Sequence, residues 1–278
     1  MKHKITLLLF LLFTVFAFAQ KGDKLKGSKI VTTEDRATGS FSSVYIQDDI
    51  VVSFIKGDST GVELEADDNL HEALKMANNS GNLTLSLNNK LTSFKKFEVK
   101  IYYTDALKNI EASDQSKLMI LDEMELEQIT FKLKDKSKLF LNLKTNAAAI
   151  EINDNASAEL NVKAEKVQFV LSKNATLKGL IAATEVKIDQ YQKSRSTLEG
   201  DVIDLKLRMD NNSKLVAKNF TAKNVEIIAE GYSETIVFAE TNCIISAFAN
   251  SQIELFGEPI IELKKFTGNA TLSKKILK

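Results

Sequence analysis

The chain has a single cysteine, Cys243, among its 278 residues. One cysteine cannot form an intramolecular disulfide, so the hydrophobic core alone must stabilise the fold. The sequence also contains one proline, Pro259, no tryptophan and no Gly/Ser-rich or low-complexity run. A flexible spacer between separate domains is therefore not expected.

Histidine is nearly absent, because His3 and His71 are the only two in the chain. His3 lies in a segment expected to be removed, so a Ser-His-Asp or Cys-His site would have to be built on His71 alone. His71 is expected to be a surface or capping residue of a short polar helix. Cys243 is expected to point into the core beside Ile245, so neither residue predicts a zinc site. The sequence names no catalytic residue, no metal ligand and no cofactor-binding residue.

Two other kinds of site are disfavoured as well. Gly57 lies in a strand turn with no following helix, which argues against a phosphate-cradling glycine loop. Asp48-Asp49 and Asp67-Asp68 are possible calcium ligands, but a turn and a helix cap explain them better. The glycine-rich nonapeptide of calcium-binding β-rolls is missing. No cofactor is expected.

Neither sign of charge dominates, since 37 Lys and Arg balance 37 Asp and Glu. Removing Lys2 and Lys4 with the N-terminal segment leaves 37 − 2 = 35 basic residues against 37 acidic ones, a net charge of −2. Both signs are interspersed along the chain. This balance argues against a nucleic-acid partner and against an anionic membrane surface as partner.

The one long apolar run lies at the N-terminus. Residues 1–19 combine a basic start, an apolar stretch from Ile5 to Phe16 and the small-residue end Ala17-Phe18-Ala19, which is the layout of a secretory signal peptide cleaved before Gln20. No later run approaches the length of a membrane-spanning helix. We therefore expect an exported protein with no membrane span, in the periplasm, on the outer surface or secreted.

What the sequence does contain is a repeat of nearly constant period. A small residue recurs with spacings of 21, 19, 19, 21, 17, 20, 18 and 19, at Ser116, Ser137, Ala156, Ala175, Ser196, Ser213, Ser233, Ser251 and Ala270. The period is too short for ankyrin, tetratricopeptide or propeller-blade units. It fits the rung of a β-solenoid, in which each rung buries its apolar face against its neighbours.

Each repeat carries a turn signal followed by strand signals. Asn precedes the small residue in five of the nine copies, and Asn tolerates the left-handed backbone of a tight corner. Stacked Asn side chains are expected to hydrogen-bond along the axis. Apolar residues then alternate with polar ones, which predicts half-buried strands. Two sets are expected to stack in register, namely Leu205, Val225 and Cys243, and Leu207, Ile227 and Ile245.

The region from residue 40 to residue 103 is not repetitive and predicts an N-terminal β-rich cap over the open end of the solenoid. Strands are expected at Val44–Ile55, Val62–Leu64, Asn82–Leu87 and Phe97–Tyr103, and a short helix at Leu70–Met76. Residues 260–278 are expected to form a last rung.

The predicted organisation is a single all-β domain, a right-handed parallel β-helix with about 19 to 20 residues per rung. Its parts are a signal peptide (1–19), an N-terminal extension (20–39) and one domain (40–278), which divides into the cap with the first strands (40–103) and the repetitive rungs (104–278).

Several stretches, taken together, resemble one family. They are, in order, Phe41–Ile46, Val51–Asp58, Asn82–Leu87, Tyr103–Ile110, the serial Ser-Lys-Leu and Asn-Ala-Thr-Leu corners, and Phe256–Pro259. Their order and spacing resemble the exported Bacteroidetes proteins described as "putative auto-transporter adhesin, head GIN domain". The resemblance implies a right-handed parallel β-helix in an envelope or secreted protein, and it supplies no catalytic residue.

The favoured function is an exported, non-catalytic envelope or surface protein that serves adhesion by binding a cell-surface glycan or an envelope protein. The lysines Lys132, Lys134, Lys136 and Lys138 offer one polar face for such contacts, although a solvated edge explains them better.

Two alternatives stay open. The chain is a structural, self-assembling β-solenoid of the envelope if a terminal rung near Leu272 pairs with another molecule. It is a polysaccharide-acting enzyme if stacked rungs place two carboxylates such as Glu226 and Glu254 together on one face. The oligomeric state and the ligand are left open.

Overall fold

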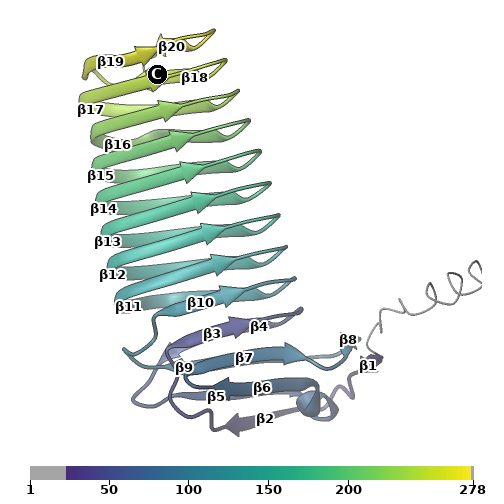
Figure 1. The fold of residues 1–278 in the computed structure, drawn as a ribbon. Helices are drawn as coiled ribbons and strands as arrows, with labels where there is room; N and C mark the ends of the chain where they lie inside the picture. Colours follow the sequence, from purple (N-terminus) through teal and green to yellow (C-terminus); the bar gives the residue numbers. More distant parts are fainter. Residues whose placement is uncertain (1–22, 277–278) are drawn as a thin grey trace, which may run out of the picture.

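The computed structural model describes residues 23–276, so the predicted signal peptide at residues 1–19 lies outside the described residues. Of the described residues, 69% are in strands and 2% in helix, and the strands form a β-solenoid of about 9 turns. In Figure 1 the front strand of each rung runs from left to right as the rungs climb from the cap to the C-terminal end, which is a right-handed coil. The all-β solenoid predicted from the repeat is confirmed.

Each complete rung is one long strand that bends at its middle. These strands are β11 (Lys117–Leu133), β12 (Lys138–Ile152), β13 (Ser157–Leu171), β14 (Thr176–Gln190), β15 (Arg195–Met209), β16 (Lys214–Ala229) and β17 (Glu234–Ala247). Neighbours pair in parallel, and the pairing skips one residue at the bend, such as Asn146 between Thr145 and Ala147. The bend resets the alternation of inward and outward side chains, so both halves of a strand bury one face.

Like residues stack on like residues in the core. The predicted column of Leu205, Val225 and Cys243 is confirmed by the pairing register, and all three are buried. The second column is longer than predicted and runs through Phe131, Ile150, Phe169, Ile188, Leu207, Ile227 and Ile245. Because every rung buries this column only between its neighbours, the rungs stabilise one another.

The corners correct one detail of the repeat. The left-handed residue is the second of each four-residue turn, at Asp114, Asp135, Asp154, Lys173, Gln192, Asn211, Gly231, Ala249 and Gly268. The recurring Asn follows it and has another role, because Asn174 donates to the Asn155 side chain at 3.1 Å and Asn269 donates to Asn250 at 3.1 Å. The predicted hydrogen bonding of stacked Asn residues along the axis is therefore confirmed at these two steps.

The alignment of one repeat was wrong by two residues. The backbone N–H of Ser194 donates to the Tyr191 carbonyl at 3.3 Å, as that of Ser213 donates to Asp210 at 3.3 Å, so Ser194 is the turn residue of its rung. Ser196 lies instead in the inward position between Leu177 and Leu215. The Ser-Arg-Ser sequence offered two serines, and only the backbone pairing distinguishes them.

The N-terminal cap is built from short strands around the first rungs. They are β1 (Lys24–Lys26), β2 (Val31–Arg36), β3 (Ser43–Ile46), β4 (Val51–Lys56), β5 (Gly61–Asp67), β6 (Leu74–Asn79), β7 (Asn82–Leu87), β8 (Lys90–Thr92), β9 (Phe97–Tyr103) and β10 (Asn109–Ala112). Antiparallel pairs β2–β5, β5–β9 and β6–β7 close the end of the solenoid. Parallel pairs β3–β10 and β4–β11 join the cap to the rungs.

The cap departs from the predicted elements in two places. The single strand expected over Val44–Ile55 is divided by a turn at Asp48, whose φ is 66°. The helix expected at Leu70–Met76 is the 3-10 helix η1 (Asp68–Ala73), and Leu74 begins β6 because it pairs with Leu87 of β7. The strands predicted at Asn82–Leu87 and Phe97–Tyr103 are confirmed as β7 and β9.

The C-terminal end is open where the N-terminal end is capped. Strand β18 (Gln252–Phe256) pairs with β20 (Thr271–Lys274), and β19 (Ile260–Phe266) pairs with β17, so the last rung is confirmed. Among residues 23–276 no further strand pairs with the outer edges of β19 and β20. Leu263 continues the core column above Ile245, yet it is 51% exposed.

Candidate functional site

The outer surface of the rungs nearest the cap is hollowed along the second halves of the strands. One hollow of about 500 Å³ extends from Lys108 to Lys187, and another of about 350 Å³ lies between Ser43 and Lys132. Both are lined by Asn109 and Thr130, so the two hollows adjoin each other at these residues. We call this surface the amide groove, and its polar lining includes Ser43, Tyr45, Asn82, Thr84, Asn109, Gln128, Thr130, Gln168, Lys108, Lys166 and Lys187.

Three consecutive alanines in β12 explain the depth of the groove. Ala148 is buried, while Ala147 and Ala149 point outward on either side of it. In the parallel register Ala149 lies between Thr130 of β11 and Gln168 of β13. Small side chains between longer ones leave a hollow, because nothing from the neighbouring rungs fills the missing volume.

The lining can both donate and accept hydrogen bonds. Side-chain amides of Asn109, Gln128 and Gln168 offer N–H donors and carbonyl acceptors. The charge at the far end is partly neutralised, because Lys166 lies 3.8 Å from Glu185. An open, largely neutral and polar surface of this kind suits an extended polar ligand bound by many modest contacts.

The four predicted lysines do not form one face. Lys132 lines the amide groove and lies 3.9 Å from Glu151, whereas Lys134 follows the strand end and pairs with Glu111 at 2.5 Å. Lys136 lies in the turn, and Lys138 starts β12 on the other half of the rung. The turn between β11 and β12 separates side chains that are close in the sequence, so only Lys132 belongs to the candidate site.

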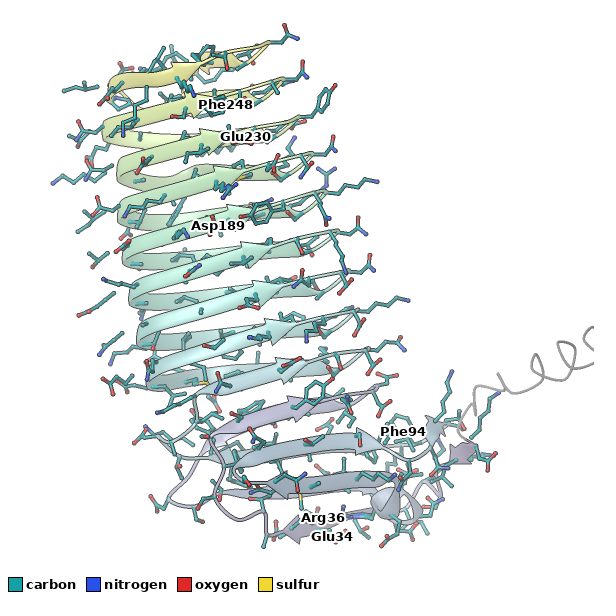
Figure 2. All side chains as sticks on the ribbon, viewed as in Figure 1. Glu34, Arg36, Phe94, Asp189, Glu230 and Phe248 are labelled. Carbon is teal, nitrogen blue, oxygen red and sulfur yellow. The ribbon has the colours of Figure 1, made fainter. Side chains whose placement is uncertain are left out.

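His71 is not the surface residue that the sequence predicts, since only 9% of it is exposed. Its Nε2 lies 2.9 Å from the Thr32 hydroxyl and its Nδ1 lies 2.9 Å from Glu34. The guanidinium of Arg36 hydrogen-bonds Glu34 at 2.9 Å and lowers the pKa of that carboxyl, with His71 acting in the same direction. Glu34 and Arg36 lie on the edge strand β2 (Figure 2), so this cluster fastens β2 to η1.

The aspartate pairs also have structural partners. The Asp67 carboxylate is fully buried and accepts backbone N–H groups of Lys29 at 2.8 Å and Lys96 at 3.0 Å. Its side chain makes no capping bond to η1, so the cap interpretation was wrong for this residue. Asp48 accepts the N–H of Leu87 at 2.8 Å and lies in a turn, as expected. Within residues 23–276 no group of three or more His, Cys, Asp or Glu side chains is arranged to hold a metal ion.

Cys243 is buried in the core beside Ile245, as predicted. Burial raises the pKa of its thiol to about 11, so it is protonated at neutral pH. The two carboxylates of the enzyme alternative are not brought together. Glu226 shares a column with Ile244, whereas Glu254 shares one with Ile236 on the other half of the rung. Their pairing as two catalytic carboxylates was therefore wrong.

The sequence reasoning missed the amide groove itself. Its signal was the run Ala147-Ala148-Ala149, which places small side chains at two neighbouring outward positions of one rung. The groove also needs Asn82 and Asn109, which are far from that run in sequence and are brought beside it by the parallel pairing of β3, β7, β10 and β11. In the part of the chain described here, no helix is long and apolar enough to cross a membrane.

Solved structures share this fold at low sequence identity. A putative adhesin from Parabacteroides merdae ATCC 43184 is 14% identical with a TM-score of 0.64, over 91% of this chain and 99% of that one. A putative adhesin from Parabacteroides distasonis ATCC 8503 is 17% identical with a TM-score of 0.64, over 91% and 98%. A protein from the same strain named a putative lipid binding protein is 13% identical with a TM-score of 0.61, over 91% and 100%.

These likenesses show the fold, because identities this low do not carry a function from one chain to another. No curated protein matches the chain. The family model described as "putative auto-transporter adhesin, head GIN domain" matches residues 40–259, which include the cap from β3 onward and the rungs through β18. The chain therefore belongs to the putative auto-transporter adhesin, head GIN domain family.

Proposed function

We propose that the chain is an exported, non-catalytic binding module of the cell surface or envelope, and that the amide groove is its contact surface for a cell-surface glycan. The family and the named adhesins of the same fold support an adhesion-like role. The observation that carries the finer proposal is the groove, whose two hollows of about 500 and 350 Å³ share Asn109 and Thr130.

A glycan is the ligand that fits this lining best. Its hydroxyl groups both donate and accept, as do the amides of Asn109, Gln128 and Gln168. The parallel register places Asn109, Thr130, Ala149 and Gln168 in one column along the axis, so an extended polymer that follows the column meets polar side chains on several rungs. The ring of Tyr45, which is half-buried, adds an apolar surface in the second hollow.

The test fills the groove without touching the core. Ala149→Arg places a long side chain in the hollow, and Ala182→Arg is the matched control, because Ala182 is an exposed alanine of β14 on the other half of its rung. On a glycan array and on envelope fractions, we expect the parent chain to bind saturably, A149R to bind at least about 10-fold more weakly, and A182R to bind like the parent. Equal binding by A149R would remove the groove from the proposal.

We further propose that residues 1–19 direct export and are removed, and that residues 40–278 form one domain preceded in the sequence by an extension at 20–39, whose strands β1 and β2 pair with β8 and β5 of the cap. The family supports an exported or surface location at that coarser level. Mass spectrometry of the intact protein recovered from a secreting host tests the cleavage. A mass that begins at Gln20 is expected, and a mass that includes Met1 would contradict it.

Self-assembly through the last rung is a second candidate, favoured by the open end at β19. Ile260 is 75% exposed and Leu263 is 51% exposed. If two copies pair β19 antiparallel about Leu263, Glu262 of each faces Lys264 of the other, which is an attractive cross-strand pair. Strand addition at an open edge of this kind is a known mode of association.

The matched variants are Leu263→Lys and Leu180→Lys, since Leu180 is also exposed, at 54%, but lies on a complete rung. Sizing chromatography over a range of concentrations measures association. We expect a concentration-dependent dimer that L263K abolishes and L180K preserves. A monomer at all concentrations would exclude assembly and leave the groove proposal unaffected.

A further inference from the structure

The corner of the cap formed by β1, β8 and the loops after them gathers lysines. We call residues 24–30 and 90–96 the basic corner. Five of its lysines are exposed, namely Lys24, Lys26, Lys29, Lys90 and Lys95. The parallel pairing of β1 with β8 places Lys24 directly opposite Lys90, and it places Lys26 opposite Thr92. Two segments more than 60 residues apart in sequence therefore contribute to one charged surface.

The exposed lysines of this corner form no direct ion pairs among the described residues. Lys96 has carboxylate partners, with Glu65 at 3.0 Å and Glu98 at 3.3 Å. None of the five exposed lysines has a carboxylate oxygen within 4.0 Å of its ammonium group among residues 23–276, in contrast to the many lysines that are paired on the rungs. The carboxylates at or beneath the corner are Asp23, Glu65, Asp67, Asp68 and Glu98, so the corner keeps a small excess of positive charge, which its exposed ammonium groups carry at the surface.

The two loops of the corner are held rigidly on a buried anion. Asp67 accepts the N–H of Lys29 at 2.8 Å from one loop, and the N–H groups of Lys95 at 3.1 Å and Lys96 at 3.0 Å from the other. Gly27 permits this approach, because a Cβ atom there would lie 2.7 Å from Cβ of Phe94 and 2.2 Å from the Asp67 carboxylate. The lysines are therefore presented on a fixed platform.

Apolar side chains project from the same platform. Phe94 is 42% exposed and Ile30 is 62% exposed. Phe94 lies at the outer edge of the cap, beside β8 (Figure 2), and its ring contacts Phe97 edge-on at 6.4 Å between centroids. This corner therefore combines an exposed aromatic ring, held by its packing on Phe97, with several exposed ammonium groups.

We propose that the basic corner binds the surface of a bilayer rich in anionic phospholipids. The lysine ammonium groups attract the lipid phosphates, while Phe94 and Ile30 enter the interfacial region of the bilayer. Long lysine side chains keep their charge in the headgroup layer while their methylene stems lie against apolar surface. The balanced net charge of the whole sequence argued against such a partner. That balance includes carboxylates on distant rungs, which do not lie close enough to neutralise the lysines of this corner.

The arrangement leaves the other candidate surfaces free. The basic corner lies at the cap end of the molecule, and β19 lies at the opposite end of the solenoid (Figure 1). A molecule bound through this corner keeps its last rung away from the bilayer. The inference does not depend on the glycan proposal, and the variants that test the two are different.

The first test is co-sedimentation with vesicles of phosphatidylglycerol and phosphatidylcholine. Lys24→Glu combined with Lys90→Glu reverses two facing charges of the corner. The matched control is Lys218→Glu with Lys223→Glu, two exposed lysines of β16 that carry the same change in net charge. All proteins are compared with the same N-terminus, checked by intact mass, because the apolar stretch from Ile5 to Phe16 would itself bind lipid.

We expect the parent chain and the β16 control to bind the anionic vesicles, with binding weakened by salt. The corner variant should bind at least about 30-fold more weakly, from a several-fold loss per lysine. Equal binding by all three proteins, equal binding to pure phosphatidylcholine, or no binding by the parent chain would overturn the proposal. Circular dichroism checks that each variant is folded.

The second test uses the absence of tryptophan from the chain. Phe94→Trp makes a single fluorophore at the corner, and Tyr232→Trp makes one at an exposed turn near the far end, where Tyr232 is 66% exposed. With anionic vesicles we expect a blue shift and quenching by brominated lipid for F94W only. A soluble acidic polymer that competes fully, with no blue shift on vesicles, would identify an acidic polymer as the partner and overturn the membrane assignment.

Discussion

At the residue scale, the least expected side chains are polar ones inside the molecule. Asp67 is fully buried beneath the basic corner of the cap, and Gln190 and Ser196 are buried in the middle of the solenoid. Each is satisfied by specific hydrogen bonds, which is the condition under which a polar group is tolerated in a core. These residues hold backbone segments together where apolar contacts alone would leave N–H and C=O groups unpaired.

Asp67 should make the stability of the cap depend on pH. Burial acts to raise its pKa, but the N–H groups of Lys96, Lys29 and Lys95 outweigh burial, and the folded pKa lies below the ordinary value of 3.8. A depressed folded pKa means that the contribution is complete above that value and is lost as pH falls through the folded pKa. We expect the thermal midpoint of the parent chain to decrease as pH falls below about 4.

The Asp67→Asn variant should have a lower midpoint at pH 7 and a flatter dependence on pH below 4, because its amide presents a donor to backbone donors. Thermal unfolding followed by circular dichroism at several pH values measures both effects. Asp201→Asn is the control, since Asp201 is exposed and forms no hydrogen bond through its side chain among the described residues. Parallel pH curves for the parent chain and D67N would contradict the assignment.

Ser196 tests the cost of an unpaired buried acceptor. Its hydroxyl donates to the Gln190 side-chain carbonyl at 2.7 Å, and the Gln190 amide donates to the carbonyls of Ser194 at 2.8 Å and Lys214 at 2.9 Å. Among residues 23–276 the Ser196 hydroxyl is the only side-chain partner of that carbonyl, so Ser196→Ala should lower the free energy of unfolding by about 1 to 3 kcal/mol. Urea denaturation measures this change in the free energy of unfolding. Thr197→Ala, at an exposed neighbour, should change the value by no more than about 0.5 kcal/mol.

At the element scale, the bent parallel strand is the unit that the repeat encodes. Its alternation of apolar and polar residues is interrupted once, at the bend, and its register is held by the tight turn before it. Departures from this plan are local. The pairing of β15 with β16 is irregular between Thr197 and Glu199, next to Gly200. Gly200 stands in an inward column between Ile181 and Phe220, both fully buried.

Gly200→Ala should be far more damaging than an ordinary glycine substitution in a strand. Gly200 has a φ of 107°, and a Cβ atom there would lie 2.2 Å from the Ile181 carbonyl oxygen, which is backbone and cannot move aside. We expect the free energy of unfolding to fall by at least about 2 kcal/mol. Gly179→Ala is the control, because its Cβ would meet only side-chain atoms at 3.1 Å. Chemical denaturation measures the free energy of unfolding of both variants. Equal losses of stability in the two variants would contradict the strain argument.

At the scale of the whole molecule, the two ends of the solenoid differ. The N-terminal end is covered by antiparallel strands and is clasped by the cluster of Glu34, Arg36 and His71. At the C-terminal end every residue of β19 is exposed. Because a rung is stabilised by its neighbours, a rung with one neighbour is less stable than a rung with two.

Hydrogen exchange should reveal this difference as a gradient. We expect the backbone amides of β19 and β20 to exchange fastest, and those of β12 to β15 to exchange slowest, because the central rungs open only with their neighbours. Mass spectrometry of peptides from a native-state exchange series measures it. Uniform protection from β11 to β20 would instead indicate that the whole solenoid opens as one unit.

The repeat could be predicted from the sequence because each of its signals lies within one rung. A turn signal, an inward aliphatic residue and an alternating strand recur every 19 residues or so, and the physics of each is contained within one rung. Residues that depart from the repeat could not be predicted from the sequence. Ser196 has the sequence context of a turn serine, and only its backbone pairing shows that it is not one. His71 likewise looks like a surface residue until β2 is seen to lie across it.

The sequence by itself determined the fold class, the stacking of like residues in the core, the position of the last rung and the lack of a second cysteine or a usable histidine. These follow from composition and from contacts at one-rung separation. Only the tertiary structure decided where surfaces arise. The amide groove joins Asn82 to Gln168, and the basic corner joins Lys24 to Lys90, because parallel pairing brings distant outward side chains together. Outward residues are not constrained by core packing, which is what gives the core its regular sequence pattern. Which outward side chains lie together therefore cannot be predicted until the pairing of the strands is known.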